Sequence, residues 1–479
     1  MDNKLEKKYG LLTAICMVVG IVIGSGVFFK AQSVLSATGG NMATGILAWL
    51  IGGIIMMICA VTFSSLAMKF QRVNGVVDYA EASVGKGYAY ALAWFLVTIY
   101  YPAMTSVLAW VSARYTMVLF IGDESLMTSG LCMTLACFYL VGSGVLNGLA
   151  PKLSGKFQVS TTFIKLVPLA LVALVGTIVG LINGNTIEAF TAASNTGSAF
   201  GNGLFAAVIA TVFAYEGWII ATAINAELKN AKRTLPLALL IGCAIIVAVY
   251  ILYFVGLAGA APVGELMTNG ATVGFRNLFG KAGATILNAF VVVSCLGTLN
   301  GLTLGCSRGM YTLAARRQGP RPKTIGEISP TTNMPTNSTL VGMVLCAAWL
   351  FYFYGANLTK SIFGMFTFDS SEIPIVTIYA LYIPIFVMFI KRHGKENIFR
   401  NVVMPVLSII ASGFMIFATV WAHGVKPFQA AREAGEFSFP ILFYMIVFAV
   451  IMGIGMLFYK KSNNDDVSLE TEDEVEENA

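Results

Sequence analysis

The sequence predicts an all-α membrane protein with about twelve transmembrane helices. Of its 479 residues, 57% are hydrophobic and only 11% are charged, whereas a soluble domain carries roughly a quarter charged residues. Apolar runs of about 20 residues recur along the whole chain, each long enough to cross a hydrocarbon core of roughly 30 Å. The first and the sixth runs contain glycine at mid-membrane, and such a pair of interruptions is typical of transporters built from inverted repeats with discontinuous helices.

The apolar runs set the expected order of elements. Polar residues 1–10 come first, with no cleavable signal peptide. Residues 73–87, VNGVVDYAEASVGKG, are too polar to span a membrane and are expected to lie at its surface or to re-enter it. An acidic cytoplasmic tail is expected at residues 461–479, and its last fifteen residues, DDVSLETEDEVEENA, are expected to be unstructured. The twelve spans are expected at about 11–36, 41–70, 88–120, 126–148, 157–182, 200–226, 236–259, 282–311, 335–354, 361–390, 401–422 and 437–459.

The basic residues predict the orientation. An even number of spans places both termini on one side. The termini and the loops of that side carry 22 of the 30 Lys and Arg residues, and the opposite loops carry five. Because basic loops stay in the cytoplasm, we expect a multi-pass protein of the plasma membrane with both termini cytoplasmic. The net charge of +6 reflects these inner loops, so nucleic acid is not an expected partner, whereas the lipid bilayer is.

The first interruption is GIVIGSGVFF at residues 20–29, where Gly24 and Gly26 flank Ser25. Irregular backbone at membrane depth is tolerated where it lines a cavity or is buried in protein. The freed amides of Gly24, Ser25 and Gly26 would favour a carboxylate at the start of the outer half-helix. The carbonyls of Ile21 and Val22 are expected to accept an ammonium group.

The second interruption is TVFAYEGW at residues 211–218, in the sixth span. It supplies four candidate ligand-binding residues, namely Phe213, Ala214, Tyr215 and Glu216. Its aromatic side chains are expected to crowd the break and keep the site small. A ligand with a carboxylate and an ammonium group on adjacent atoms is an α-amino acid, which makes small amino acids the expected substrates. The alternative is that GSG only packs helices closely and that Glu216 bonds a neighbouring group.

One lysine lies deep within an apolar span. Lys165, in TTFIKLVPLALVALVG, would cost at least ~2.5–3.5 kcal/mol if it faced lipid, so it is expected to face the protein interior. Its ammonium group can donate three hydrogen bonds, and the carbonyls freed at the first break are suitable acceptors. A fixed ammonium there could replace a bound sodium ion. One alternative is that Lys165 takes up and releases a proton during transport. Another is that its side chain extends to the lipid headgroups on the cytoplasmic side.

Four motifs together resemble the L-type amino acid transporter branch of the amino acid–polyamine–organocation superfamily. They are GIVIGSGVF, TTFIKL, FAYEGW followed by AELKNAKRTLP, and LGTLNGL with SRGMYTLAARR. The resemblance covers about residues 8–460 and is greatest to the bacterial serine/threonine and alanine-serine-cysteine exchangers. It implies one transporter domain over residues 11–460 with a 5+5 inverted repeat, and sodium-independent exchange by alternating access. The implied parts are repeat one at about 11–182, repeat two at about 200–390, and two appended spans at about 401–459.

The resemblance also implies roles for single residues. The lysine matching Lys165 bridges the first and eighth spans, and Ser294 and Thr298 are the candidates on the eighth. Tyr250 matches a tyrosine that lines the site in some relatives. The loop between spans three and four, IGDESLM, lacks the cysteine through which animal relatives bind an ancillary glycoprotein. We therefore expect no disulfide-linked heavy subunit. Glu216 stands where many relatives have a neutral residue.

These observations favour an exchanger of small neutral L-amino acids such as serine, threonine, alanine or cysteine. A proton-coupled symporter, and a transporter of cationic amino acids or polyamines selected by Glu216, remain as alternatives. We do not expect an enzyme, because the sequence contains neither HExxH nor GxSxG and its two histidines lie near helix ends. Its eight cysteines lie within or beside apolar runs without a CxxC pair. Neither a metal nor another cofactor is expected.

Overall fold

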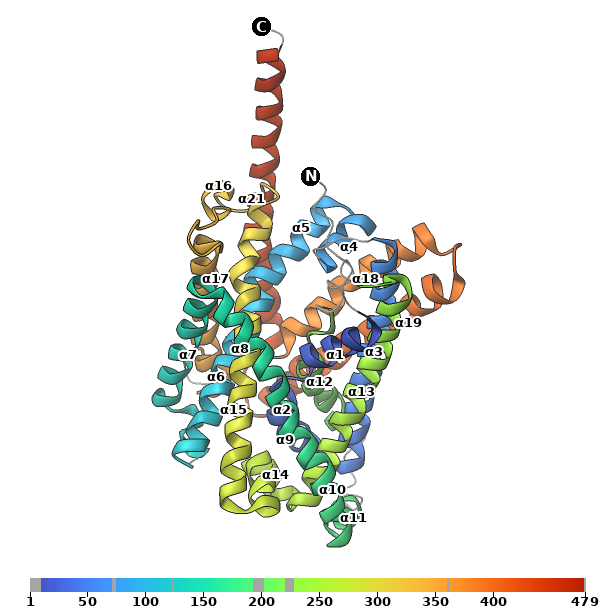
Figure 1. Ribbon diagram of the computed structural model, residues 1–479, viewed down its shortest axis with the longest axis vertical. Coiled ribbons are helices and arrows are strands. Elements are labelled where there is room, and N and C mark those ends of the chain that lie inside the picture. Colours follow the sequence, from blue (N-terminus) through green and yellow to red (C-terminus); the bar gives the residue numbers. More distant parts are fainter. Residues whose placement is uncertain are drawn as a thin grey trace.

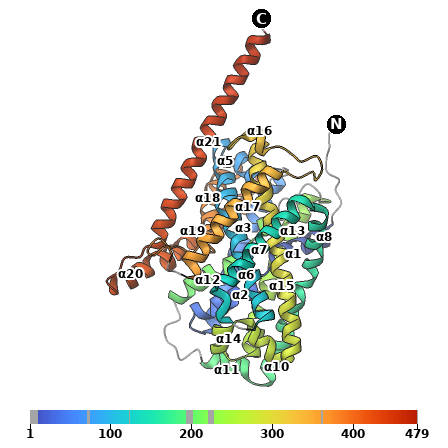
Figure 2. The ribbon, with the colours of Figure 1, turned by 90° about the vertical axis from the view of Figure 1, so that its left-hand side faces the viewer.

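The computed structural model describes residues 10–70, 75–122, 124–192, 202–219, 228–359 and 362–477. These residues form a helical bundle (Figures 1 and 2). Within the described ranges, ten helices or helix runs are long and apolar enough to cross a membrane. They are α3 (Met42–Lys69), α5 to α6 (Lys86–Phe120), α7 (Gly130–Leu149), α8 to α10 (Pro151–Ile182), α13 (Ala231–Ala260), α15 (Ala271–Ala314), α17 with its π-helical end (Thr336–Leu358), α18 (Ile373–His393), the run through α19 and α20 (Phe399–Glu433), and α21 (Pro440–Glu477).

The predicted first and sixth spans are shorter helices. The first consists of α1 (Leu11–Val22) and α2 (Gly26–Ala37), and the sixth begins with α12 (Asn202–Tyr215). In both views α1, α2 and α12 lie near mid-height of the bundle (Figures 1 and 2). The all-helical membrane architecture and the break in the first span are therefore confirmed. The second half of the sixth span lies outside the described residues, and the division into two inverted repeats stays a prediction.

The polar segment before the third span forms a short helix, α4 (Val76–Ser83). Arg316 at the end of α15 bonds Asp78 at 2.6 Å and Glu81 at 3.1 Å. Arg392 at the end of α18 donates to the Ala82 carbonyl at 2.8 Å. These contacts fix α4 against the ends of two long helices. Residues 73 and 74, the start of the predicted segment, lie outside the described residues.

An exposed ion pair lies between the ends of α3 and α18. Lys69, the last residue of α3, donates to Glu396 just beyond α18. This bond holds the pKa of the Glu396 carboxyl below its ordinary value. Since both side chains reach solvent, the pair contributes little to stability.

Several boundaries differ from the prediction, and two of these differences have a clear physical reason. The tenth span begins at Ile373 instead of 361, because the Asp369 side chain accepts from the amides of Ser371 and Glu372 and so forms a turn before the helix. At the C-terminus, α21 continues to Glu477 and leaves the bundle at the end opposite α11 (Asn185–Ala192) and α14 (Val263–Asn269) (Figure 1). The prediction of an unstructured tail was wrong here, since the segment after Lys461 contains neither Gly nor Pro to end the helix.

Proline reshapes the third span. Pro102 has no N–H to donate to the Thr98 carbonyl, and the helix widens into π-helical turns over η1 (Leu96–Tyr100) just before it. The indole N–H of Trp349, on α17, donates to this freed carbonyl at 2.9 Å. The widened turn carries Tyr100 and leads into Tyr101, and both line the central cavity described next.

Candidate functional site

The first helix break lies where the sequence predicts it. α1 ends at Val22, α2 begins at Gly26, and the backbone between them is not helical. The amides of Ser25, Gly26 and Val27 donate to no backbone carbonyl within the described residues. These amides therefore form a positive helix N-terminus that can accept an anion.

The second break follows α12. The helix ends at Tyr215, and Glu216 and Gly217 form a turn. Gly217 has φ 104°, a left-handed conformation that glycine adopts without a Cβ clash. The rest of the predicted sixth span falls largely on residues 220–227, which lie outside the described residues.

The two breaks touch each other. A Cβ added to Gly26 would lie 2.8 Å from the Cα of Ala214, so only glycine fits at this position. The hydroxyl of Tyr250, on α13, lies 3.2 Å from the Val22 carbonyl and 3.0 Å from the Ala214 carbonyl. A hydroxyl has one proton to donate, so it serves one carbonyl at a time. Tyr250 thus competes with a ligand for the Val22 carbonyl, which was expected to accept an ammonium group.

A cavity of about 260 Å³ lies between the breaks. Its polar side chains come from five parts of the chain: Ser25, Tyr100 beside Tyr101, Gln158 with Lys165, Glu216, and Thr298. The remaining wall is backbone of the two breaks and apolar side chains such as Ile219 and Ile378. This arrangement offers both anionic and cationic partners to one small polar molecule.

Lys165 connects the fifth span to the first break. The residue is buried at the junction of α8 (Pro151–Ile164) and α9 (Leu166–Leu171), and its Nζ donates to the Gly20 carbonyl in the last turn of α1. Within the described residues, no bond joins Lys165 to the eighth span. Instead, Thr298 donates to the Ser294 carbonyl at 3.0 Å and lies against Gly24, where an added Cβ would be 3.0 Å from Thr298 Oγ1.

Glu216 is the acidic group of the cavity. Both carboxylate oxygens are buried, and neither completes a hydrogen bond of good geometry in the described part of the chain. The Tyr100 hydroxyl and the Gly217 amide are polar groups near it. Burying a carboxylate costs free energy unless hydrogen bonds or an opposite charge compensate it. Glu216 is therefore suited to bind a proton or to accept a hydrogen bond from a ligand.

The structure brings together most of the predicted site residues. Nine of them line the cavity: Val22, Gly24, Ser25, Gly26, Lys165, Phe213, Ala214, Glu216 and Thr298. The other predicted site residues are Ile21, Tyr250, Ser294 and Tyr215. Ile21 belongs to the last turn of α1, Tyr250 holds the carbonyls described above, and the Ser294 hydroxyl is buried. Tyr215 points away and donates to the Trp49 carbonyl at 2.8 Å.

The aromatic wall differs from the prediction. Phe213 lines the cavity, but Tyr215 and Trp218 do not. Trp218 is fully buried and packs against Phe63 and Tyr382. Tyr100 and Tyr101 supply the aromatic surface instead, and sequence reasoning missed them. The signal available for them was Pro102, which follows two tyrosines in the middle of a span.

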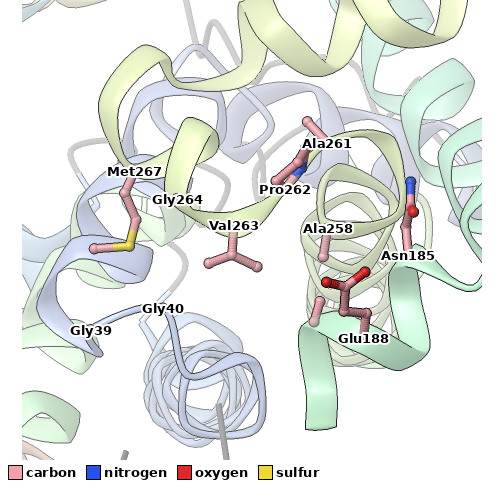
Figure 3. Close-up of a pocket in the computed structure, with 11 residues that line it drawn as sticks. Gly39, Gly40, Asn185, Glu188, Ala258, Ala261, Pro262, Val263, Gly264 and Met267 are labelled. Atoms are coloured by element: carbon pink, nitrogen blue, oxygen red, sulfur yellow. The ribbon is translucent and has the colours of Figure 1, made fainter. Parts of the chain in front are cut away.

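A second cavity of about 360 Å³ lies at the end opposite α21 (Figure 3). Met267 of α14 and Glu188 of α11 lie on opposite sides of it, with Val263 between them (Figure 3). Glu188 is the one ionisable residue among those that line it. Glycine, alanine and other apolar residues form most of its wall, so it lacks the paired charges of the central cavity.

Comparison with known proteins identifies the family. The amino acid permease family model matches residues 9–452. The chain belongs to the amino acid permease family. This permease is 30% identical to the serine/threonine exchanger SteT of Bacillus subtilis (strain 168), over 88% of its own length and 92% of that relative. It is 26% identical to the human b(0,+)-type amino acid transporter 1, over 95% and 88%, and 27% identical to the human cystine/glutamate transporter, over 73% and 68%.

The permease also shares its fold with a solved structure. The crystal structure of MhsT in complex with L-phenylalanine matches with a TM-score of 0.58 at 12% identity, covering 87% of this chain and 99% of that one. The expected membership in an amino acid transporter family is therefore confirmed. The relatives carry the names of transporters and exchangers, and an apolar, multi-helical chain of this family is a multi-pass membrane protein.

Proposed function

We propose that this permease exchanges small neutral L-amino acids, such as serine, threonine, alanine and cysteine, without sodium and by alternating access. The observation that carries the proposal is the small cavity between the two touching breaks, with the free amides of α2 on one side and Glu216 on the other. Its volume of about 260 Å³ is below the roughly 300–1,000 Å³ of pockets for drug-sized ligands. The likeness to a serine/threonine exchanger supports the same substrate class.

Lys165 supports sodium independence. Its ammonium group lies against the Gly20 carbonyl at the end of α1, where the negative end of a helix dipole favours a cation. A covalently attached cation at that place removes the need for a bound one. We also propose that the permease lies in the plasma membrane with both termini in the cytoplasm, and that it works without a disulfide-linked heavy subunit.

The test is uptake of radiolabelled serine into proteoliposomes, with and without unlabelled serine inside, in sodium-free buffer. Exchange predicts uptake that needs internal amino acid and that collapses in Lys165→Ala. Uptake into empty vesicles driven by an inward proton gradient would instead identify a proton-coupled symporter. Absence of serine uptake under both conditions would rule out serine as the substrate.

A second candidate function is transport of cationic amino acids or polyamines. The unpaired carboxylate of Glu216, buried in the cavity wall, favours it, because a cationic group on the ligand would compensate that charge. Competition by arginine or putrescine, lost in Glu216→Gln, would establish this alternative. Competition by alanine and threonine that persists in Glu216→Gln would exclude a cation-selecting role for the carboxylate.

A further inference from the structure

A group of buried charges lies outside the central cavity, where α2, the start of α18 and η8 (Trp421–Val425) meet. Lys30 of α2 donates to Glu372 Oε1 at 2.6 Å. His423 Nε2 lies 3.1 Å from the other oxygen, Glu372 Oε2. We refer to Lys30, Glu372 and His423 as the Glu372 triad. Glu372 therefore bridges the outer half of the first span to the end of the eleventh.

The triad is held in place by its surroundings. Lys30 is 3% exposed and Glu372 is 9% exposed. Such buried charges persist only when they are paired, and removing one partner leaves the other uncompensated. Asp369 fixes the turn that carries Glu372, since it accepts from the amides of Ser371 and Glu372 at 2.7 and 3.0 Å. Asp369 and Arg114 also line the cavity that the triad borders, and Asp369 lies near enough to His423 to interact with it electrostatically.

The triad lies between two cavities. Lys30, Glu372 and His423 line a cavity of about 610 Å³ that shares no lining residue with the central one. Phe29 lines this cavity and packs edge-on against Phe213 of the central cavity, with ring centroids 5.2 Å apart. The Lys30 ammonium lies 5.4 Å from the centroid of each ring. One layer of side chains thus separates the two spaces, and Lys30 belongs to it.

We propose that the Glu372 triad is an ionic latch that closes the central cavity toward the 610 Å³ cavity. Lys30 lies on the same 12-residue helix as Gly26, which lines the central cavity. For this route to open, α2 must move away from α18, and the Lys30–Glu372 bond must break. The latch rests on the proposed alternating access and on the predicted orientation, which makes the 610 Å³ cavity extracellular.

The test measures access to the central cavity without any substrate. Met104 lines that cavity and is buried, so Met104→Cys reports whether it is open. A membrane-impermeant thiol reagent is added to intact cells, and labelling is corrected for the parent protein with its eight native cysteines. The exposed Ser36, which lines the 610 Å³ cavity, supplies Ser36→Cys as the control for reagent access. Inside-out vesicles repeat the measurement from the opposite face.

The expected result is a labelling rate of Met104→Cys that rises about tenfold in Lys30→Met, because loss of the latch shifts the closed–open equilibrium. The matched control is Lys69→Met, which removes a lysine–glutamate pair at the other end of the bundle and should leave the rate unchanged. Charge reversal by Lys30→Glu should also open the cavity, and adding Glu372→Lys should close it again.

The latch would be overturned if Lys30→Met, Glu372→Gln and Lys30→Glu all labelled at the parent rate from both faces. If one single variant fails to fold, the double variant Lys30→Glu with Glu372→Lys still tests the latch, because it restores an ion pair with the charges exchanged. A failure of the proposed substrate would leave the labelling result unaffected, since no amino acid is present. A closed cavity in Lys30→Glu would likewise contradict the latch.

Discussion

Lys165 donates a hydrogen bond to the carbonyl of Gly20, and this bond joins the fifth span to the last turn before the first break. The two residues are 145 positions apart in the chain. Because the carbonyl lies at a helix C-terminus, it is one of the acceptors that the helix itself cannot satisfy. A buried ammonium there both completes the hydrogen bonding of α1 and places a fixed positive charge beside the cavity.

We therefore expect Lys165→Met to reduce amino acid exchange at least about tenfold, since a hydrogen bond to a charged group contributes roughly 1.5–3 kcal/mol. Initial exchange rates in proteoliposomes measure the effect. The matched control is Lys156→Met, which changes an exposed lysine of the same helix and should leave the rate unaltered. Equal rates in Lys165→Met and the parent would remove Lys165 from the mechanism.

Tyr250 gives a second prediction. Tyr250→Phe keeps the ring and removes only the hydroxyl that lies within hydrogen-bond distance of the Val22 and Ala214 carbonyls. We expect a loss of about 1–3 kcal/mol of stability, because a buried carbonyl loses its donor. Thermal unfolding of the detergent-purified permease measures it. The control is Tyr253→Phe on the same helix, since the Tyr253 hydroxyl is buried without a partner in the described residues. A similar melting temperature for both variants would contradict the assignment.

The sequence was informative where a residue breaks a local rule. Gly24, Ser25, Gly26 and Gly217 interrupt apolar runs. In the structure residues 23–25 separate two helices, with Gly26 as the first residue of the second helix, and Gly217 lies in a turn. Lys165 had to face the interior because lipid excludes charge. Each of these inferences depends only on the chemistry of one residue and on its depth in the membrane.

Side-chain direction could not be predicted in the same way. Tyr215 and Trp218 lie within two residues of Glu216, yet neither lines the cavity. Tyr215 donates to the Trp49 carbonyl, and Trp218 packs against Phe63 and Tyr382. Lys30 was also missed as a buried charge, because its partner Glu372 is 342 positions away. Such pairings depend on packing between distant spans, which a single sequence does not reveal.

Gly26 gives a third prediction. In Gly26→Ala the new Cβ would lie 2.8 Å from the Ala214 Cα, and backbone on that side cannot move away as a flexible side chain could. We expect transport to be abolished and the melting temperature to fall. Gly142→Ala on α7 is the control, because no atom lies within 4 Å of its added Cβ, and it should be neutral or slightly stabilising. Normal transport by Gly26→Ala would show that the breaks do not touch.

The last prediction concerns the proline in the third span. Trp349→Phe removes the indole N–H that donates to the Thr98 carbonyl, the acceptor that Pro102 cannot serve. The lost bond should cost about 1–3 kcal/mol beyond the loss of packing. Trp49→Phe is the matched control, because Trp49 is also buried and its Nε1 has no partner in the described residues. A larger fall in melting temperature for Trp349→Phe supports the bond. If Trp49→Phe were equally or more destabilising, packing alone would account for the effect, and the freed Thr98 carbonyl would need another donor.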